Sequence, residues 1–351
     1  MKKLPLFYEN IPNGDCKIYN NLLVIKTSPK ADIWISSHLN IILDESFNCN
    51  FGDYAPYDMN YYDNILSINK VNKPSPEFII EKIIEKINAD KYIVLLLNIE
   101  RMLEYEDTFT EKFRHILIYG YDINENHVIC ALIKNGKLSE TEISFDSIIH
   151  AYSDIYEQHP SDIIPILNRQ NNFYDITELT IKDNYKNDNW IYDMMNKLKH
   201  EINGKQIIEK VYSEDKTINL TRTMYTGLAC IDYLQLYLNK KKSFNAFDQF
   251  ELNKLSETFK KLHDHRNIIL SSMKYFMDAV GATNNINLQD SINNYQNHIS
   301  TMQIAYMLLS KYAQTNKESL YQNIINKISN QYQLEYQDLQ LFIHSMSEYC
   351  L

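Results

Sequence analysis

The stretch Arg114–Asp122, RHILIYGYD, decides the fold class of the first half of this chain. It places a histidine at the start of an apolar run that ends at Gly120 and a turn, as is typical of a buried strand. The runs HVICALI (127–133) and LSETEIS (138–144) follow, and the Asn135-Gly136 pair between them is a strong hairpin signal. Three antiparallel strands are therefore predicted between residues 115 and 144.

Apolar segments of helix and strand type come before this sheet. SPEFIIEKIIEKINAD (75–90) predicts an amphipathic helix, with Ser75 as its cap and Pro76 in its first turn. KYIVLLLNIE (91–100) has the length and composition of a strand, and FDSIIHAYSDI (145–155) predicts a helix or turn. Helices followed by an antiparallel sheet predict an α+β domain over residues 1–158.

Helical spacing of apolar residues dominates the chain from about residue 171 onward. We therefore expect an all-α domain over residues 171–351. Within it, KLHDHRN (261–267) brings His263, Asp264 and His265 together in one predicted helix. Residues two positions apart point to different sides of a helix, so this group predicts a solvated face rather than a metal site.

Composition narrows the classes of function. A formal charge of −10 argues against a nucleic-acid binder, and only seven glycines occur, none of them in a phosphate-binding motif. The five cysteines form no CxxC pair, which favours a reducing compartment and no metal site. No signal peptide and no apolar run of membrane-spanning length is visible, so we expect a cytoplasmic protein without a membrane partner.

The candidate chemistry rests on Cys16 and His115. Cys16 follows PNGD (12–15) at the predicted start of a helix, where the helix dipole favours a thiolate. A thiolate beside an imidazole is the activated nucleophile of cysteine acyl transfer, with His115 as the base. The alternatives are a small buried thiol at position 16 and a structural histidine at position 115.

A third group is expected to orient the imidazole. Hairpin counting places residues 133–135 opposite His115, which makes Asn135 a candidate; its alternative role is that of a turn residue before Gly136. Asn13 is a candidate donor to an oxyanion, together with the backbone amide of Cys16.

These residues carry a family resemblance. The DC pair at 15–16, WI at 34–35, RHILIYGYD, NGK at 135–137 and ISFDSIIHAY (143–152) resemble papain-like, peptidase C39-like proteins of bacterial natural-product clusters, the family of the N-terminal domain of butirosin biosynthesis protein H. The resemblance covers most of residues 1–155. It implies a papain-like cysteine protease fold and an acyltransferase that forms amides. Its acyl donor is then a thioester on the phosphopantetheine arm of a carrier protein, its acceptor is a small amine, and it needs no cofactor of its own.

One departure from the family pattern concerns the third group. Many members of that family carry an aspartate about four residues before NGK, where this chain has Ala131. Either Asn135 replaces it, or a Cys–His pair suffices, or catalysis is lost. The last case predicts a peptidase-like accessory protein that only binds a peptide or acyl chain. A cysteine peptidase is a further alternative, because a fold does not fix a function.

Overall fold

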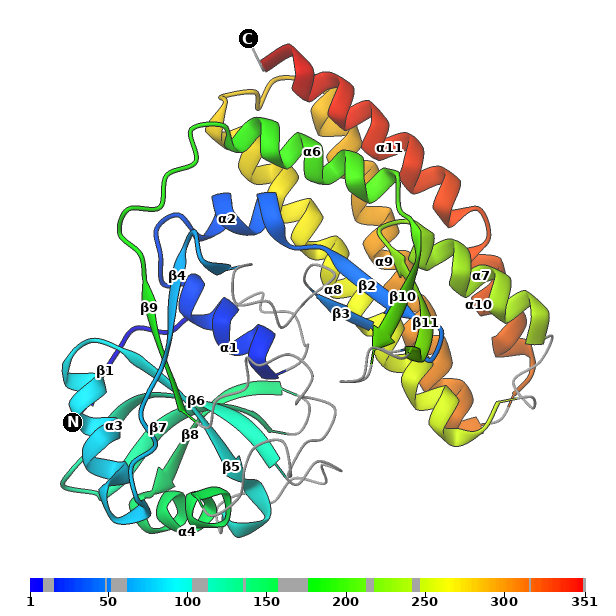
Figure 1. Cartoon of the computed structure of the whole chain (residues 1–351). Helices are drawn as coiled ribbons and strands as arrows, with labels where there is room; N and C mark the ends of the chain where they lie inside the picture. The colour runs from blue at the N-terminus through cyan, green and yellow to red at the C-terminus, as the bar shows by residue number, and fades with distance from the viewer. Residues whose placement is uncertain are drawn as a thin grey trace. The chain divides into compact units, whose positions relative to one another are not determined.

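The computed structural model describes residues 1–8, 16–47, 49–51, 62–102, 113–134, 137–156, 176–212, 218–241, 247–315 and 317–349 (Figure 1). The chain forms two compact units. Unit 1 contains Met1–Ala31 and Ala55–Lys186, and unit 2 contains Asp32–Tyr54 and Asn187–Leu351. The chain therefore enters each unit twice.

Unit 1 is built on one antiparallel sheet. Its strands run in the order β4 (Leu66–Lys70), β9 (Ile176–Ile181), β5 (Tyr92–Asn98), β6 (Phe113–Asp122), β7 (His127–Lys134) and β8 (Lys137–Ser144). The short strand β1 (Lys2–Lys3) also pairs with β6, at Gly120. A Cβ atom at Gly120 would lie 2.9 Å from the carbonyl oxygen of Lys2, so only glycine admits this close approach. The three strands predicted between residues 115 and 144, and the strand before them, are confirmed.

Three helices accompany this sheet: α1 (Cys16–Ile25), α3 (Ile79–Asn88) and α4 (Phe145–Tyr156). α1 packs against β6 and β9, and α4 packs against β5. The predicted helix at 75–90 is confirmed as a 3₁₀ turn, η2 (Pro76–Phe78), that continues into α3. Ser75 stands at the cap position, but its side chain makes no capping hydrogen bond. A second 3₁₀ turn, η3 (Ile99–Arg101), follows β5.

Unit 2 contains a second antiparallel sheet, so the expectation of an all-α second domain is wrong. The sheet has the order β10 (Gln206–Tyr212), β11 (Ile218–Thr226), β2 (Ile41–Asp44), β3 (Cys49–Phe51). Its two halves come from opposite ends of the sequence, and Leu43 pairs with Tyr225. The apolar side chains of Ile41, Leu43 and Phe47 are buried in the same core as helices α7 (Ala229–Lys241) and α8 (Gln249–Ala279), which explains why this segment leaves unit 1.

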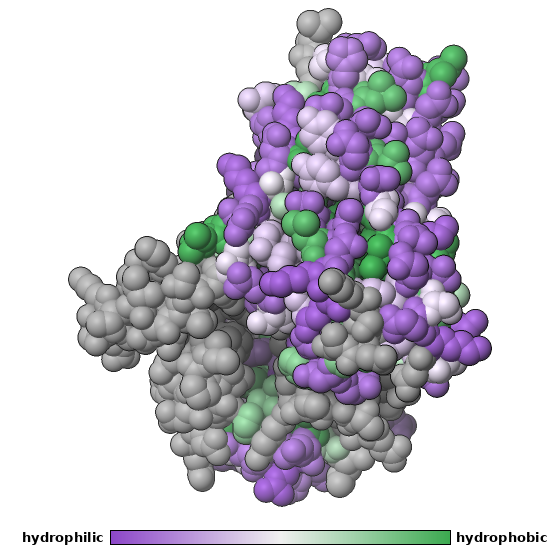
Figure 2. All heavy atoms as spheres, turned by 90° about the vertical axis from the view of Figure 1, so that its right-hand side faces the viewer, coloured by the Kyte–Doolittle hydropathy of each residue, from purple (hydrophilic) through white to green (hydrophobic). Residues whose placement is uncertain are grey.

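Helices make up the rest of unit 2. They are α2 (Ala31–His38), α6 (Trp190–Ile202), α7 (Ala229–Lys241), α8 (Gln249–Ala279), α9 (Ile286–Thr315), α10 (Ser319–Ile328), α11 (Gln331–Met346) and the 3₁₀ turn η6 (Ser347–Tyr349). α8 begins with a capping box, in which Asp248 accepts from the amide of Glu251 and Glu251 accepts from that of Asp248. α8 packs along α9, and α9 packs along α10 and α11. In Figure 2, hydrophilic residues cover most of the visible coloured face of the helical part, and hydrophobic residues form small separate spots.

The division into units differs from the expected domains 1–158 and 171–351. Residues 32–54 belong to unit 2, whereas β9 completes the sheet of unit 1 beyond residue 158 by pairing with β4 and β5. Among the described helices, none combines the length and the apolar character that crossing a membrane requires. The broad α+β class with an antiparallel sheet is confirmed.

Candidate active site

His115 lies inside the sheet of unit 1 and not at an open strand end. It pairs with Leu96 of β5 and is only 6 % exposed. β6 is hydrogen-bonded on its other side to β7, so His115 belongs to a central strand. A titratable ring in such a place needs polar partners, because burying an unsatisfied imidazole is costly.

Cys16 is the first residue of α1, as the sequence predicts. This position puts it at the positive end of the helix dipole. Its side chain lies outside what the structure describes, and so do Asn13 and Asn135. What the structure does fix is the path of α1 and the strand against which that helix packs.

Within the described part of the chain, the side chain of Asn20 joins α1 to the backbone of His115. Nδ2 of Asn20 donates a hydrogen bond of 3.3 Å to the carbonyl oxygen of His115. Asn20 is fully buried, and it lies four residues after Cys16. Residues four apart in a helix lie one above the other on the same side, so position 16 lies one turn beyond this contact. The helix that begins with Cys16 and the strand that carries His115 are therefore in direct contact.

Ala131 occupies a position from which an acidic side chain could orient the imidazole of His115. It pairs with Leu117 of β6, two residues after His115, which makes Ala131 a diagonal neighbour of His115 on the same face of the sheet. Its methyl group cannot accept a hydrogen bond from the imidazole. Counting on from Leu117 brings position 133 opposite His115. Asn135 lies outside the described residues.

Asn98 is a buried amide close to His115, but its side chain already has hydrogen-bond partners. Asn98 of β5 lies two residues beyond Leu96, the partner of His115. Its Nδ2 donates to Oδ2 of Asp154 over 2.6 Å, and its Oδ1 accepts from the backbone amide of Glu100 over 3.2 Å. This side chain therefore ties β5 to α4 and caps η3, which is a structural role.

A polar cluster that the sequence did not reveal anchors the first residues of the chain to the same sheet. Nζ of Lys3 lies 2.6 Å from Oε2 of Glu140, the hydroxyl of Tyr119 donates to Glu140, and the hydroxyls of Tyr8 and Tyr119 are 2.8 Å apart. Burial raises the pKa of Tyr8 to about 12. Burial alone would raise the pKa of Glu140, but the hydrogen bonds from Lys3 and Tyr119 outweigh it and hold that pKa below its usual value.

The charge states fix the direction of these hydrogen bonds. An ionised Glu140 only accepts, so Tyr119 uses its proton on Glu140 and must accept the proton of Tyr8. Glu140 also pairs with Ala131 across the sheet, one row from His115. The cluster thus fixes the chain up to Tyr8, eight residues before Cys16. It joins three segments that are distant in sequence, and no local pattern signals it.

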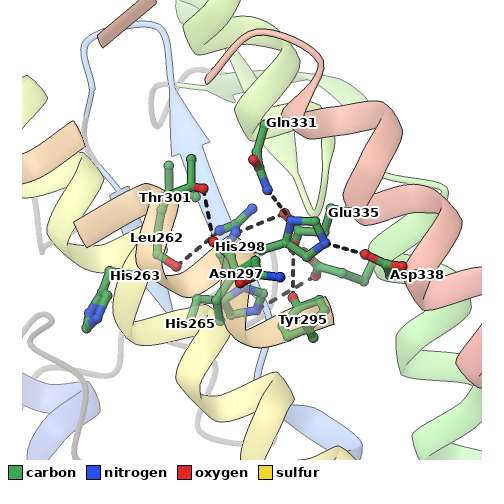
Figure 3. A network of polar contacts seen from close by, with 12 residues as sticks. Leu262, His263, His265, Tyr295, Asn297, His298, Thr301, Gln331, Glu335 and Asp338 are labelled. Atoms are coloured by element: carbon green, nitrogen blue, oxygen red, sulfur yellow. Dashed lines mark hydrogen bonds and ion pairs between the residues drawn. The ribbon is translucent and has the colours of Figure 1, made fainter. Parts of the chain in front are cut away.

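The helical part of unit 2 holds a second group of polar side chains, which is buried (Figure 3). Glu335 of α11 accepts from the hydroxyl of Tyr295 over 2.7 Å and from Nε of Arg266 over 3.0 Å. Nε2 of His298 lies 2.7 Å from Oδ2 of Asp338, and Gln331 contacts the other ring nitrogen of His298. These contacts join α8, α9 and α11.

The KLHDHRN motif contributes to this interior, which corrects the prediction of a solvated face. His265 is fully buried, and its Nε2 lies 3.7 Å from Oε2 of Glu201 on α6. His263 and Asp264 keep partly exposed side chains, at 26 % and 24 %. Arg266 pairs with Glu335 of α11, and both are fully buried. The motif therefore faces the core through Leu262, His265 and Arg266.

Burial also shifts the pKa values of ionisable side chains on α6 and α8 in the interior of unit 2. It raises the pKa of Glu201 to about 7, lowers that of Lys197 to about 8 and lowers that of His265 well below its usual value. Because the principal groups are almost completely shielded from solvent, they are placed to hold helices together and not to meet a substrate. Within the described part of the chain, no three His, Cys, Asp or Glu side chains are arranged to hold a metal ion.

The three cysteines whose side chains the structure describes are not candidate nucleophiles. Cys49, Cys130 and Cys230 are buried, and burial raises the pKa of both Cys49 (to about 12) and Cys230. A thiol that resists ionisation is a poor nucleophile. Neither the known family models nor the curated proteins include a match to this chain.

Proposed function

We propose that this protein is a cysteine-dependent acyltransferase of the papain-like type, which moves an acyl group from a carrier-protein thioester to a small amine. Cys16 is the nucleophile and His115 the base. The supporting observation is the contact between α1, which begins at Cys16, and the strand that carries His115, made by Asn20. The resemblance of residues 1–155 to the peptidase C39-like proteins supplies the class of reaction.

The reaction has two balanced steps. The Cys16 thiolate attacks the thioester carbonyl, and the carbon–sulfur bond to the phosphopantetheine arm breaks. The protonated His115 gives its proton to that arm, which leaves as a thiol. The amine then attacks the acyl-enzyme, His115 accepts the proton that the nitrogen loses, and the amide leaves as the Cys16 thiolate is restored. The backbone amide of Cys16 and the side chain of Asn13 are the proposed donors to the oxyanion.

The burial of His115 favours aminolysis over hydrolysis. A base that is 6 % exposed has little contact with bulk water, so the amine that binds beside it competes with few water molecules. Ala131 cannot hold the imidazole by a hydrogen bond, so either Asn135 orients it or the Cys16–His115 pair suffices. A carrier protein and a small amine are the proposed partners, and the cytoplasm is the proposed location.

A binding protein without catalysis is the second candidate. The observation in its favour is Ala131, which stands on the face of His115 where the related proteins have an acid. In that case the sheet of unit 1 would hold a peptide or acyl chain without reacting with it. A cysteine peptidase, the third candidate, would turn over peptides with no carrier protein present.

Intact-protein mass spectrometry tests the proposal. The chain is incubated with a butyryl thioester of N-acetylcysteamine, and the mass of the protein and the site of acylation are followed. We expect one acyl adduct on Cys16, none in Cys16→Ala, and slower formation in His115→Gln. Cys130→Ala and His127→Ala, which change a buried thiol and a second histidine of the same sheet, should leave the adduct intact.

Addition of small amines separates the outcomes. Release of the acyl group as an amide supports the acyltransferase, and release as a free acid points to hydrolysis. The absence of any adduct on Cys16 in a folded protein would overturn the proposal in favour of the binding protein. Circular dichroism of each variant checks that it is folded.

A further inference from the structure

We propose that Asn20 is a positioning residue, which sets the distance between the Cys16 end of α1 and His115. The inference rests on the proposed roles of Cys16 and His115. It adds a residue that does not touch the substrate and acts through the backbone of the base.

The burial of Asn20 calls for an explanation. It is fully buried, between apolar residues of α1 that are also buried, such as Ile18, Leu22 and Leu23. An amide in such surroundings costs free energy unless its groups are hydrogen-bonded, and a leucine of similar size would be better tolerated in an ordinary core. The side-chain oxygen Oδ1 of Asn20 has no hydrogen-bond partner among the described residues. The one described hydrogen bond of this side chain is therefore the one from Nδ2 to His115.

The partner atom makes this bond specific. Nδ2 of Asn20 donates to the main-chain oxygen of His115, and a main-chain atom of a central strand cannot move without moving the strand. The bond therefore fixes α1 along and across β6 at the residue that carries the imidazole. Apolar packing alone is non-directional and would allow the helix to slide.

The spacing carries this constraint to Cys16. Four residues of α-helix rise about 6 Å, and they bring position 16 back to the same side of α1 as Asn20. A helix is stiff over one turn, so a shift at Asn20 becomes a shift of similar size at Cys16. Since a misplacement of about 1 Å can cost a catalytic pair about a hundredfold in rate, one hydrogen bond at this place is sufficient to matter.

Asn21 provides a matched control. It is the next residue of α1, it is also a buried amide at 3 % exposure, and no described hydrogen bond joins it to His115. It lies about 100° farther around the helix. Asn20→Leu and Asn21→Leu therefore remove the same chemical group from neighbouring positions at similar burial.

The test is the rate at which iodoacetamide alkylates Cys16, measured against pH by intact mass and peptide mapping. It is run on the wild-type chain and on His115→Gln, Asn20→Leu and Asn21→Leu. We expect the wild type to react at lower pH than a free cysteine, whose pKa is about 8.5. His115→Gln should lose this advantage, and Asn20→Leu should lose about ten-fold in rate below neutral pH. Asn21→Leu should follow the wild type, and thermal unfolding of both leucine variants checks that they are folded.

The outcomes separate this proposal from the proposed function. A wild type that acylates and alkylates as expected, with Asn20→Leu unchanged or Asn21→Leu equally slowed, overturns the role of Asn20 alone. A wild-type Cys16 that reacts like a free thiol and depends on no histidine overturns both. If Asn20→Leu is unfolded, Asn20→Ser takes its place, because its shorter side chain cannot reach the same oxygen.

Discussion

The charge of Glu201 should control the stability of unit 2. The carboxylate is buried in the helical interior, its Oε1 has no hydrogen-bond partner among the described residues, and its Oε2 is 3.7 Å from Nε2 of His265, too far for a hydrogen bond. Burial lowers the pKa of His265, so at neutral pH this ring is uncharged and does not compensate the carboxylate. We predict that Glu201→Gln removes a pH dependence of unfolding that the wild type possesses.

The size and sign of the effect follow from proton binding. Burial raises the pKa of Glu201 from 4.5 to about 7, with a smaller contribution from Glu335, and this outweighs the attraction of Arg266 and Lys197. The folded state therefore binds an extra proton between these two values. Stabilisation by this proton is fully present below about pH 4.5 and is lost as the pH rises through 7, a change of roughly 3 kcal/mol in the free energy of unfolding.

Lys197 acts in a separate pH range. Burial lowers its pKa to about 8, so deprotonation of its folded form begins near that pH. Its contribution rises only as the pH increases from about 8 toward its ordinary value, and it does not mask the fall between about pH 5 and 7.

Urea unfolding followed by tryptophan fluorescence measures this effect. Both tryptophans of the chain, Trp34 and Trp190, belong to unit 2, so the signal reports that unit. The difference between the unfolding free energies of the wild type and Glu201→Gln should change by roughly 2–3 kcal/mol between about pH 5 and 7.5. Glu348→Gln, an exposed control on η6, should show no such change. A difference that stays constant with pH would refute the assignment of the buried charge to Glu201.

Three further results are expected. Arg266→Met alone should lower the unfolding free energy of unit 2 by about 3–5 kcal/mol, because it leaves Glu335 charged and buried, and a second change, Glu335→Leu, should recover much of that loss in urea titrations. Gly227→Ala should destabilise unit 2 by at least about 1 kcal/mol by the same measurement, because Gly227 has φ +54° and a Cβ atom there would lie 2.4 Å from the carbonyl oxygen of Glu201. In native thiol titration with a disulfide reagent, the described buried thiols should stay unreacted until urea is added: Cys49, Cys130 and Cys230.

Four strands of unit 1, β5 to β8, were predictable because their signals are local, whereas β1, β4 and β9 were not predicted. β6, β7 and β8 follow one another across short turns, and each has its apolar run and its turn residues within about ten positions. The start of α1 at Cys16 was predictable for the same reason, since Pro12, Asn13, Gly14 and Asp15 precede it. None of these predictions required knowledge of a distant partner.

The second sheet was not predicted because it pairs strands that are distant in sequence, β2 with β11. β11 falls in the region that the helical spacing predicts to be all-α, although Thr221, Thr223 and Thr226 favour a strand and Gly227 marks its end. β2 has four buried residues, a pattern that fits a helix or a strand equally well. The pairing of Leu43 with Tyr225 decides between helix and strand, and neither segment alone predicts that pairing.

The candidate site shows the same division. Cys16 and His115 were found as residue types at meaningful positions, whereas Asn20, which links their two elements, looked like any polar residue of a helix. The clusters around Glu140 and Glu335 also join segments from distant parts of the sequence. Buried polar contacts depend on the packed structure, so periodicity cannot reveal them.

The interleaved path of the chain has a consequence for its synthesis on the ribosome. β2 pairs with β11, so residues 41–44 wait for a partner that is made some 180 residues later. At ordinary rates of elongation this delay is roughly ten to forty seconds. Throughout it, Ile41, Leu43 and Phe47 have no core to enter, because the helices that bury them have not yet been made. The nascent chain therefore exposes an apolar segment during that time. Chaperone binding during translation should be concentrated on residues 32–54.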